Sequence, residues 1–342
     1  MSRVKHPKQL FGEEHIEISP EDKRFATPKN AALYRAERLA CNTIIDLCSG
    51  LGFQSFAFAQ TCKNVVAVEK DPNLIAKARK FAEQLGIKNI TFYCGDALSL
   101  EISAKMPKAD IVFCDPERYA QEEHRTLATI QPNIHQLIER YSLTTKNIAI
   151  EFPPHISGLD FDAEYEYMSD NGALNRLTLY FGSLKTADKS VILLPEKIRI
   201  YSKENAQLNI VKSTEEYFYV LEPNPAVALS GLFREALAYE NEDKISVQDI
   251  AVIEHQKKTL LLSKKKIVSP FFACYNILER SSTEKEDILK KLQAVNAGKV
   301  IIRYSLAPQE YWKERIFYEK KLHGERAVHL FLFDQAVLCE KL

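Results

Sequence analysis

No long apolar run occurs in the sequence; its apolar stretches, such as residues 191–194, have only the length of a strand. A helix that spans a membrane needs about 20 consecutive apolar residues, so we expect no membrane span. The N-terminal residues Met-Ser-Arg-Val-Lys-His run into polar sequence without the apolar core of a secretion signal. These two absences predict a cytoplasmic protein.

The seven cysteines include no Cys-x-x-Cys pair, and their spacing along the chain is irregular. Disulfide frameworks and zinc sites usually show paired or regularly spaced cysteines. We therefore interpret these residues as small buried side chains of a reduced protein. Surface or helix-cap positions account for His124, His135 and His155, so we expect no bound metal.

Neither sign of charge is in excess, because 46 lysines and arginines balance 46 aspartates and glutamates. The total charge therefore gives no support for a nucleic-acid partner, although a local patch can still bind one. Hydrophobic residues make up 46% of the chain and charged residues 27%, which excludes the disordered and fibrous classes and predicts a soluble globular protein.

The order of the expected elements divides the chain into three regions. Residues 1–40 form a polar lead-in that becomes helical at Thr27-Pro28, with threonine as N-cap and proline at the first helical position. Residues 41–202 alternate strands with helices and close with an antiparallel hairpin, which predicts a doubly wound α/β domain. Residues 203–342 predict a smaller α+β domain.

Four acidic residues follow or end successive strands of the second region. In such sheets ligands bind at the carboxyl ends of the strands, and a carboxylate there can accept hydrogen bonds from a ribose diol. Turns and helix caps would explain any one of these residues, but they explain all four together poorly. The residues are Asp46 in Asp46-Leu-Cys-Ser-Gly50-Leu-Gly52, Glu69, Asp96 after Gly95, and Asp115 before Pro116.

The glycine-rich turn after the strand at 43–47 discriminates between two cofactors. A dinucleotide fingerprint needs a third glycine to make room for the pyrophosphate, and Ser55 stands at that position. S-adenosylmethionine carries no phosphate and needs only the shorter Gly-x-Gly. The turn therefore favours S-adenosylmethionine over NAD.

The series Asp46-x-x-x-Gly50-x-Gly52, Glu69-Lys-Asp71, Gly95-Asp96-Ala97 and Asp115-Pro116 resembles the motifs of class I S-adenosylmethionine-dependent methyltransferases. The resemblance implies a Rossmann-like sheet of seven strands. It also implies that Asp46, Gly50 and Gly52 line the methionine part of the donor, Glu69 the ribose and Asp96 the adenine amine. The full set of expected donor-binding residues is Thr27, Asp46, Cys48, Gly50, Gly52, Phe53, Glu69, Lys70, Asp96 and Ala97.

Two further resemblances point to RNA. The lead-in segment Phe25-Ala-Thr-Pro28 resembles RNA cap trimethylguanosine synthases and their relatives. Several later motifs resemble a prokaryotic group in which the methyltransferase domain carries a C-terminal THUMP-like RNA-binding module. These motifs are Pro153-Pro154, Leu174-Asn-Arg-Leu177, Glu222-Pro-Asn-Pro225, Ala297-Gly-Lys299 and Leu322-His-Gly-Glu-Arg326.

The expected acceptor site departs from the pattern of amine methyltransferases, which is Asp/Asn-Pro-Pro followed by an aromatic residue. Here the stretch reads Asp115-Pro116-Glu117-Arg118-Tyr119. The turn can still accept hydrogen bonds from a base, and an aromatic ring can stack on it. We therefore take Asp115, Pro116, Glu117 and Tyr119 as the catalytic candidates. Methylation at uracil C5 is not expected, because no cysteine stands near the fifth strand.

The last part of the chain carries a local excess of positive charge. Residues 257–342 contain 17 lysines and arginines against 10 aspartates and glutamates, and aromatic residues such as Trp312 are interleaved among them. Such a pattern is typical either of RNA binding or of a solvated face above an aromatic core. Together with the resemblance, it predicts RNA as the partner of residues 203–342.

The sequence therefore predicts a methyltransferase that modifies a base in structured RNA, such as tRNA or rRNA. Two alternatives stay open. The chain could methylate a small molecule or a protein, with the C-terminal domain as a lid or a dimerisation element. It could also be an RNA-binding protein whose methyltransferase domain has lost its activity, as the altered Asp-Pro-Glu-Arg stretch suggests.

Overall fold

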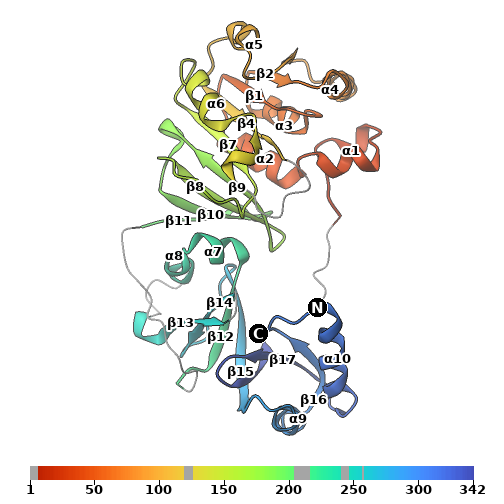
Figure 1. Ribbon diagram of the computed structural model, residues 1–342, viewed down its shortest axis with the longest axis vertical. Helices are drawn as coiled ribbons and strands as arrows, with labels where there is room; N and C mark the ends of the chain where they lie inside the picture. The colour runs from red at the N-terminus through yellow and green to blue at the C-terminus, as the bar shows by residue number, and fades with distance from the viewer. Residues whose placement is uncertain (1–6, 119–125, 204–215, 240–245, 256–257) are drawn as a thin grey trace. The chain divides into compact units, whose positions relative to one another are not determined.

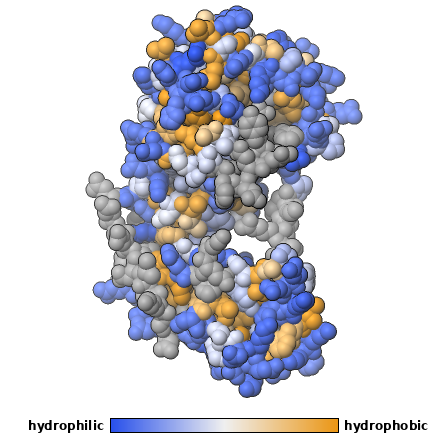
Figure 2. Space-filling model, viewed as in Figure 1, coloured by the Kyte–Doolittle hydropathy of each residue, from blue (hydrophilic) through white to orange (hydrophobic). Residues whose placement is uncertain are grey.

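The computed structural model describes residues 7–118, 126–203, 216–239, 246–255 and 258–342. The chain forms two compact units, of which the first ends at Ser202 and the second begins at Lys203 (Figure 1). Within the described part of the chain, no helix is long and apolar enough to cross a membrane. Hydrophilic residues cover most of the surface that each unit shows in Figure 2.

The first unit contains five parallel strands in the order β7-β4-β1-β2-β3. Because the chain leaves β1 on one side and returns on the other, the order reverses beside β1, where doubly wound folds bind their ligands. The strands are β1 (Thr43–Leu47), β2 (Asn64–Glu69), β3 (Ile90–Cys94), β4 (Ile111–Cys114) and β7 (Ile148–Phe152), and the helices between them are α3 (Phe53–Thr61), α4 (Pro72–Gln84), α5 (Leu100–Lys105) and α6 (Ile134–Tyr141).

Four more strands extend this sheet to nine in the described residues, so the expected number of seven is wrong. Two hairpins are present instead of one, and Lys197, with a left-handed φ of 59°, makes the second turn without the glycine that would have signalled it. The added strands are β8 (Glu164–Asp170), β9 (Ala173–Tyr180), β10 (Lys189–Leu194) and β11 (Ile198–Tyr201).

Alternate residues of the parallel strands enter different apolar clusters on the two faces of the sheet. Ile45 and Val112 pack on the face that Leu137 of α6 covers. Ile44 and Phe113 pack on the opposite face, against helices α2 and α3. This alternation is the period of a strand that is buried on both sides, and it fixes which polar side chains point toward α2.

The lead-in belongs to the same unit as the sheet and contributes η1 (Glu13–His15), α1 (Pro20–Phe25) and α2 (Lys29–Arg38). Helix α2 begins one residue later than Thr27-Pro28 predicts, with Pro28 at the N-cap position and no side-chain cap. Helix α6 begins at Ile134, where the side chain of Asn133 caps it. Residues 126–131 form η2 (Leu127–Thr129) and β6 (Ile130–Gln131), which pairs with β5 (Glu117–Arg118).

The second unit is built on a separate seven-stranded sheet in the order β13-β14-β12-β15-β18-β17-β16, with α9 and α10 packed on one face. Left-handed Gly231 ends the first of two short helices that follow the first strand of this unit. The elements are β12 (Tyr219–Pro223), α7 (Pro225–Ser230), α8 (Phe233–Ala238), η4 (Val247–Asp249), β13 (Ile250–His255), β14 (Lys258–Ser263), β15 (Phe272–Ser281), α9 (Lys285–Ala294), β16 (Ala297–Ile302), α10 (Pro308–Glu319), β17 (Arg326–Leu332) and β18 (Ala336–Lys341).

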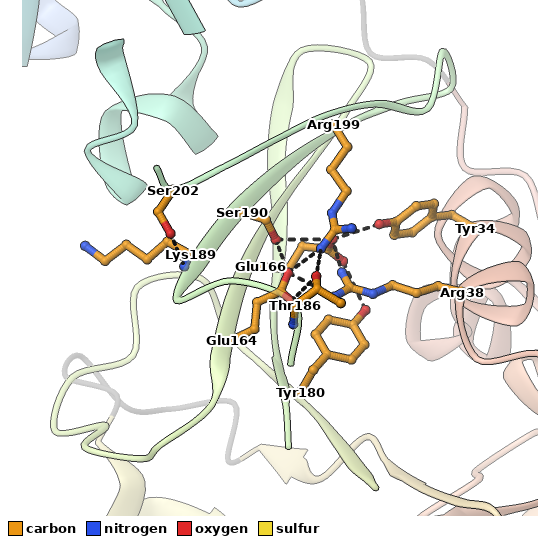
Figure 3. A network of polar contacts seen from close by, with 10 residues as sticks. All are labelled: Tyr34, Arg38, Glu164, Glu166, Tyr180, Thr186, Lys189, Ser190, Arg199 and Ser202. Carbon is orange, nitrogen blue, oxygen red and sulfur yellow. Dashed lines mark hydrogen bonds and ion pairs between the residues drawn. The ribbon is translucent and has the colours of Figure 1, made fainter. Parts of the chain in front are cut away.

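A buried ionic network joins α2 to the antiparallel end of the first sheet (Figure 3). Glu164 and Glu166 of β8 have no exposed side-chain surface, and Arg38 of α2 and Arg199 of β11 each form ion pairs with both carboxylates. Hydroxyl groups complete the network: Tyr34 (2.7 Å) and Tyr180 (3.0 Å) donate to Glu166, while Thr186 (2.9 Å) and Ser190 (2.5 Å) donate to Glu164. Two cations thus balance two buried anions.

The balance of this network predicts how it responds to mutation. Glu166→Gln leaves two partly buried guanidinium groups with one buried carboxylate. The free energy of unfolding should fall by about 3–5 kcal/mol, as for other buried pairs that lose one partner. Glu37→Gln, on the same helix, breaks an exposed pair with Lys197 and should cost less than about 1 kcal/mol. Urea denaturation of both variants measures the difference; equal losses would contradict the role of the buried network.

Candidate donor and acceptor site

The turn between β1 and α3 is shaped by three residues in the left-handed conformation: Cys48 (φ 58°), Gly50 (φ 53°) and Gly52 (φ 83°). A Cβ atom at Gly52 would lie 2.9 Å from the ring of Phe56, so no side chain fits there. A Cβ atom at Gly50 would meet no atom within 4 Å. The turn is therefore tight against α3 at Gly52 and open at Gly50, where a ligand can approach the backbone.

Glu69, at the end of β2, holds this turn in place. Its carboxylate is buried, and it accepts hydrogen bonds from the backbone N–H of Gly50 (2.8 Å) and of Asp71 (2.9 Å). Each carboxylate oxygen has a second lone pair, so both remain able to accept a further bond. In the same turn the buried Oγ of Ser49 has no hydrogen-bond partner among the described residues. Buried polar atoms are normally paired, so this hydroxyl fits a ligand bound at the turn.

Asp46, one residue before the end of β1, is 1% exposed and accepts a hydrogen bond from the Ser55 hydroxyl. Burial raises the pKa of Asp46 to about 7, although the Ser55 hydrogen bond opposes the shift. The nearby carboxylate of Asp115 raises the pKa further, and Arg35 lowers it. Asp46 is thus influenced by two neighbouring elements, through Asp115 just after β4 and through Arg35 of α2.

The other expected donor residues lie around the same edge of the sheet. Phe53 is buried in an apolar cluster that also contains Leu51 and Ala26. Thr27, the residue after Ala26, is buried as well. Lys70 is exposed at the end of β2.

Asp96 and Ala97 follow β3 and stand in different environments. Asp96 is exposed, and its Oδ1 accepts a hydrogen bond from the backbone N–H of Leu98 (2.8 Å). Ala97 is buried, and its carbonyl accepts a hydrogen bond from the hydroxyl of Tyr141 (2.9 Å). The segment is thus fixed to α6 at Ala97, while the Asp96 side chain remains accessible.

The four catalytic candidates are placed only in part. Asp115 follows β4 and is partly buried, and Pro116 is buried. Glu117 lies in β5, where its backbone pairs with Gln131. Tyr119 lies outside the described residues. The chain therefore continues from Asp115 into a short antiparallel ladder.

A second ionic cluster, which the sequence did not predict, lies at the carboxyl edge of the first sheet. Glu151, near the end of β7, has no exposed side-chain surface and forms ion pairs with Arg35 of α2 and Arg176 of β9. Arg35 also donates to Gln54 of α3 (2.5 Å). One signal was available: a glutamate inside the apolar run Ile148-Ala-Ile-Glu-Phe152 is costly to bury unless cations pair with it. Within the described residues, no group of three or more metal-ligating side chains occurs.

Comparison with known proteins bears on the first unit. Residues 41–178 match the family model described as a methyltransferase domain. The chain is 39% identical over 77 residues to a 23S rRNA (uracil(1939)-C(5))-methyltransferase of Shewanella sp. (strain MR-4), covering 22% of this chain and 17% of that protein. It is 30% identical over 145 residues to an uncharacterized RNA methyltransferase of Halalkalibacterium halodurans, covering 37% and 32%. The matches thus span less than a third of these relatives.

A solved structure, a proposed methyltransferase of Porphyromonas gingivalis W83, has a similar fold over most of the chain. Its TM-score is 0.72 at 17% identity, and the alignment covers 94% of this chain and 83% of that one. The geometry of the turn, with open space at Gly50 and an unpaired hydroxyl at Ser49, fits the donor that such domains use. Residues 41–178 thus match a methyltransferase domain, and the glycine turn fits S-adenosylmethionine as the methyl donor.

Proposed function

We propose that the chain is an S-adenosylmethionine-dependent methyltransferase that modifies a base in structured RNA, such as tRNA or rRNA. The observation that carries the proposal is the match of residues 41–178 to the methyltransferase domain, with the turn at Gly50 and four acidic residues at successive strand ends. The RNA substrate is supported by the relatives named as RNA methyltransferases, at modest identity and over part of their length.

In this proposal the turn from Asp46 to Gly52 binds the methionine part of the donor, Glu69 the ribose and Asp96 the adenine amine. The donor supplies a methyl group that its sulfonium has already activated. The protein's task is then to hold the acceptor atom in line with that methyl group and to exclude water. Asp115 stands beyond the donor residues in the strand order, so we place the acceptor beside it.

Glu69→Ala tests the donor site. The variant loses the ribose hydrogen bonds and the bond that holds Gly50, and bonds to charged groups contribute about 1.5–3 kcal/mol each. The affinity for S-adenosylhomocysteine, measured by calorimetry, should therefore fall at least about tenfold. Asp71→Ala is the matched control. The carboxylate of Asp71 lies two residues after Glu69 but caps α4 by accepting a hydrogen bond from the backbone N–H of Asn73. Unchanged affinity in Glu69→Ala, or tight binding of NAD by the native protein, would contradict the assignment.

One chemical requirement argues against C5 of uracil as the target atom. Methylation at uracil C5 uses a cysteine nucleophile that adds to the ring, and residues 148–154 at the end of β7 contain none. We propose that Asp115 and the backbone of Pro116 accept hydrogen bonds from the target base, with Glu117 and Tyr119 facing the same nucleotide.

Transfer of a tritiated methyl group into RNA, protein and small-molecule fractions tests the substrate class. We expect label in RNA with the native protein and none with Asp115→Ala. The donor affinity of this variant should stay within about threefold, because the proposal places Asp115 beside the acceptor and not beside the donor. Label in the protein or small-molecule fraction would favour the first alternative. Donor binding without label in any fraction would favour an RNA-binding protein that has lost activity. Normal transfer by Asp115→Ala would show that this residue only shapes the turn.

The second unit is the proposed RNA-binding part, and its ion pairs refine that proposal. Trp312 is 58% exposed and lies beside the guanidinium of Arg315, as a base-stacking residue could. Many cations of the unit already pair with carboxylates, so fewer can contact phosphates than the sequence count indicates. These pairs include Lys264–Glu216, Lys265–Asp249, Lys285–Glu314, Arg303–Glu222, Arg315–Glu319 and Lys321–Glu286.

Salt dependence measures how many of these cations contact RNA. For about four phosphate contacts, the logarithm of the affinity for tRNA should fall with the logarithm of the salt concentration with a slope of roughly −3. Alanine at Lys264, Lys265 and Lys266 should flatten the slope by up to about 2. Alanine at the exposed residues Lys63, Lys80 and Lys88 of the first unit serves as the control and should leave the slope unchanged. Binding that does not depend on salt would remove the case for an RNA-binding unit.

A further inference from the structure

The two buried ionic clusters of the first unit differ in their charge balance. In the cluster of Figure 3, Glu164 and Glu166 face Arg38 and Arg199, so two anions balance two cations. In the other cluster one carboxylate, Glu151, pairs with two guanidinium groups. A single carboxylate cannot neutralise two arginines, so the ion pairs with Glu151 alone leave one positive charge unbalanced. The carboxylate of Asp115 also acts on Arg176.

Arg35 cannot present this charge to a ligand. Its side chain has no exposed surface. One terminal nitrogen, Nη2, contacts Glu151, and the other, Nη1, donates to Gln54. The guanidinium also lies over the ring of Phe113, 5.0 Å from its centroid. Both terminal nitrogens of Arg35 are therefore engaged within the protein, and its Nε is buried without a hydrogen-bond partner among the described residues.

Arg176 is held differently. Its Nε pairs with Glu151, and the described residues provide no hydrogen-bond partner for Nη1 or Nη2. The side chain is 19% exposed. A guanidinium fixed at Nε presents its other two nitrogens in a rigid fork, the geometry that binds an oxyanion through two hydrogen bonds.

The strand register places this fork at the carboxyl edge of the sheet. Cys114 of β4 pairs with Ile150 of β7, so Asp115 and Glu151 each stand one residue beyond that pair. Glu151 pairs with Thr178 of β9, and Arg176 lies two residues earlier on β9, on the same face. Asp115, Glu151 and Arg176 therefore lie side by side on three neighbouring strands.

Electrostatic effects agree with this placement. Burial acts to lower the pKa of Arg176, but the carboxylates of Glu151 and Asp115 have a larger opposite effect. The pKa is therefore raised, and the guanidinium stays charged. Lys8 of the lead-in lies near the same residues: burial lowers its pKa to about 8, Arg176 contributes to the decrease, and Asp115 opposes it. Two cations thus lie beside the position proposed for the acceptor.

We propose that Arg176, fixed by Glu151, binds a phosphate group of the methyl acceptor at the carboxyl edge of the sheet. This assignment rests on the proposed function in one respect, the location of the acceptor beside Asp115. The phosphate can belong to an RNA chain or to a free nucleotide, and the geometry of a bidentate arginine suits both. Arg176 would then select acceptors that carry a phosphate next to the methylated group.

Phosphate binding to the full-length protein, saturated with S-adenosylhomocysteine, tests the assignment without any need for activity. In ³¹P NMR titrations with inorganic phosphate and with uridine 5′-monophosphate, Arg176→Gln should weaken binding at least about tenfold, because two charge-assisted hydrogen bonds are lost. Arg176→Lys should bind with intermediate affinity, since it keeps the charge but not the fork. Arg79→Gln, which removes an exposed guanidinium on α4, is the control and should bind as the native protein does.

The variant should keep its fold, because Arg176→Gln leaves Glu151 paired with Arg35 in a balanced one-to-one pair. An unchanged affinity for S-adenosylhomocysteine verifies this. Equal phosphate affinity in the native protein and in Arg176→Gln would overturn the proposal, and so would an equal loss in Arg79→Gln. Uridine, which lacks the phosphate, should not distinguish the variants.

An oligoribonucleotide identifies the source of the phosphate. If it binds more tightly than uridine 5′-monophosphate and is weakened by Arg176→Gln, the phosphate belongs to RNA. If the monophosphate binds at least as tightly, the acceptor is a small phosphorylated molecule. Phosphate binding that depends on Arg176, in a protein that methylates no RNA, would retain the phosphate site and refute the RNA substrate.

Discussion

Three glutamates buried on one face of the first sheet have to be paired with cations, and much of the first unit follows from this requirement. Glu164 and Glu166 on β8 and Glu151 on β7 have no exposed side-chain surface, so unpaired charges there would be costly. Helix α2 provides two of the required cations, Arg35 and Arg38, three residues apart on one face. The lead-in is therefore a structural layer of the first unit.

The ion pairs of α2 link the core to the glycine turn that is proposed to bind the donor. Arg35 reaches Gln54 in the first turn of α3, directly after the glycine turn, while Glu69 holds the other side of that turn at Gly50. The donor turn is thus held from α2 and from β2. Such support costs little at the moment of binding, because the backbone is already ordered, and it explains how Cys48 can adopt a left-handed conformation that usually costs about 1–3 kcal/mol.

The sequence predicted the parallel half of the sheet and the tight glycine turn after β1, because both depend on local signals. Alternating strand and helix patterns set the order of β1 to β4, and the glycines and acidic residues mark strand ends. The antiparallel end was harder, since Lys197 makes a turn without a turn residue. The cluster around Glu151 could not be derived, because its partners Arg35 and Arg176 are 116 and 25 positions away in the chain, and only the folded sheet brings them together.

The ion pairs also show why counting charges along a sequence is a poor guide to a binding surface. In residues 257–342 the sequence shows seven more positive than negative charges, yet lysines such as Lys285 and Lys321 already contact carboxylates of the same unit. At the edge of the first sheet, where the sequence shows no basic cluster, Arg176 shares the carboxylate of Glu151 with Arg35. A cation can bind a ligand's phosphate only with charge that its own neighbours have not neutralised, so the pairing of each residue decides where phosphates can bind.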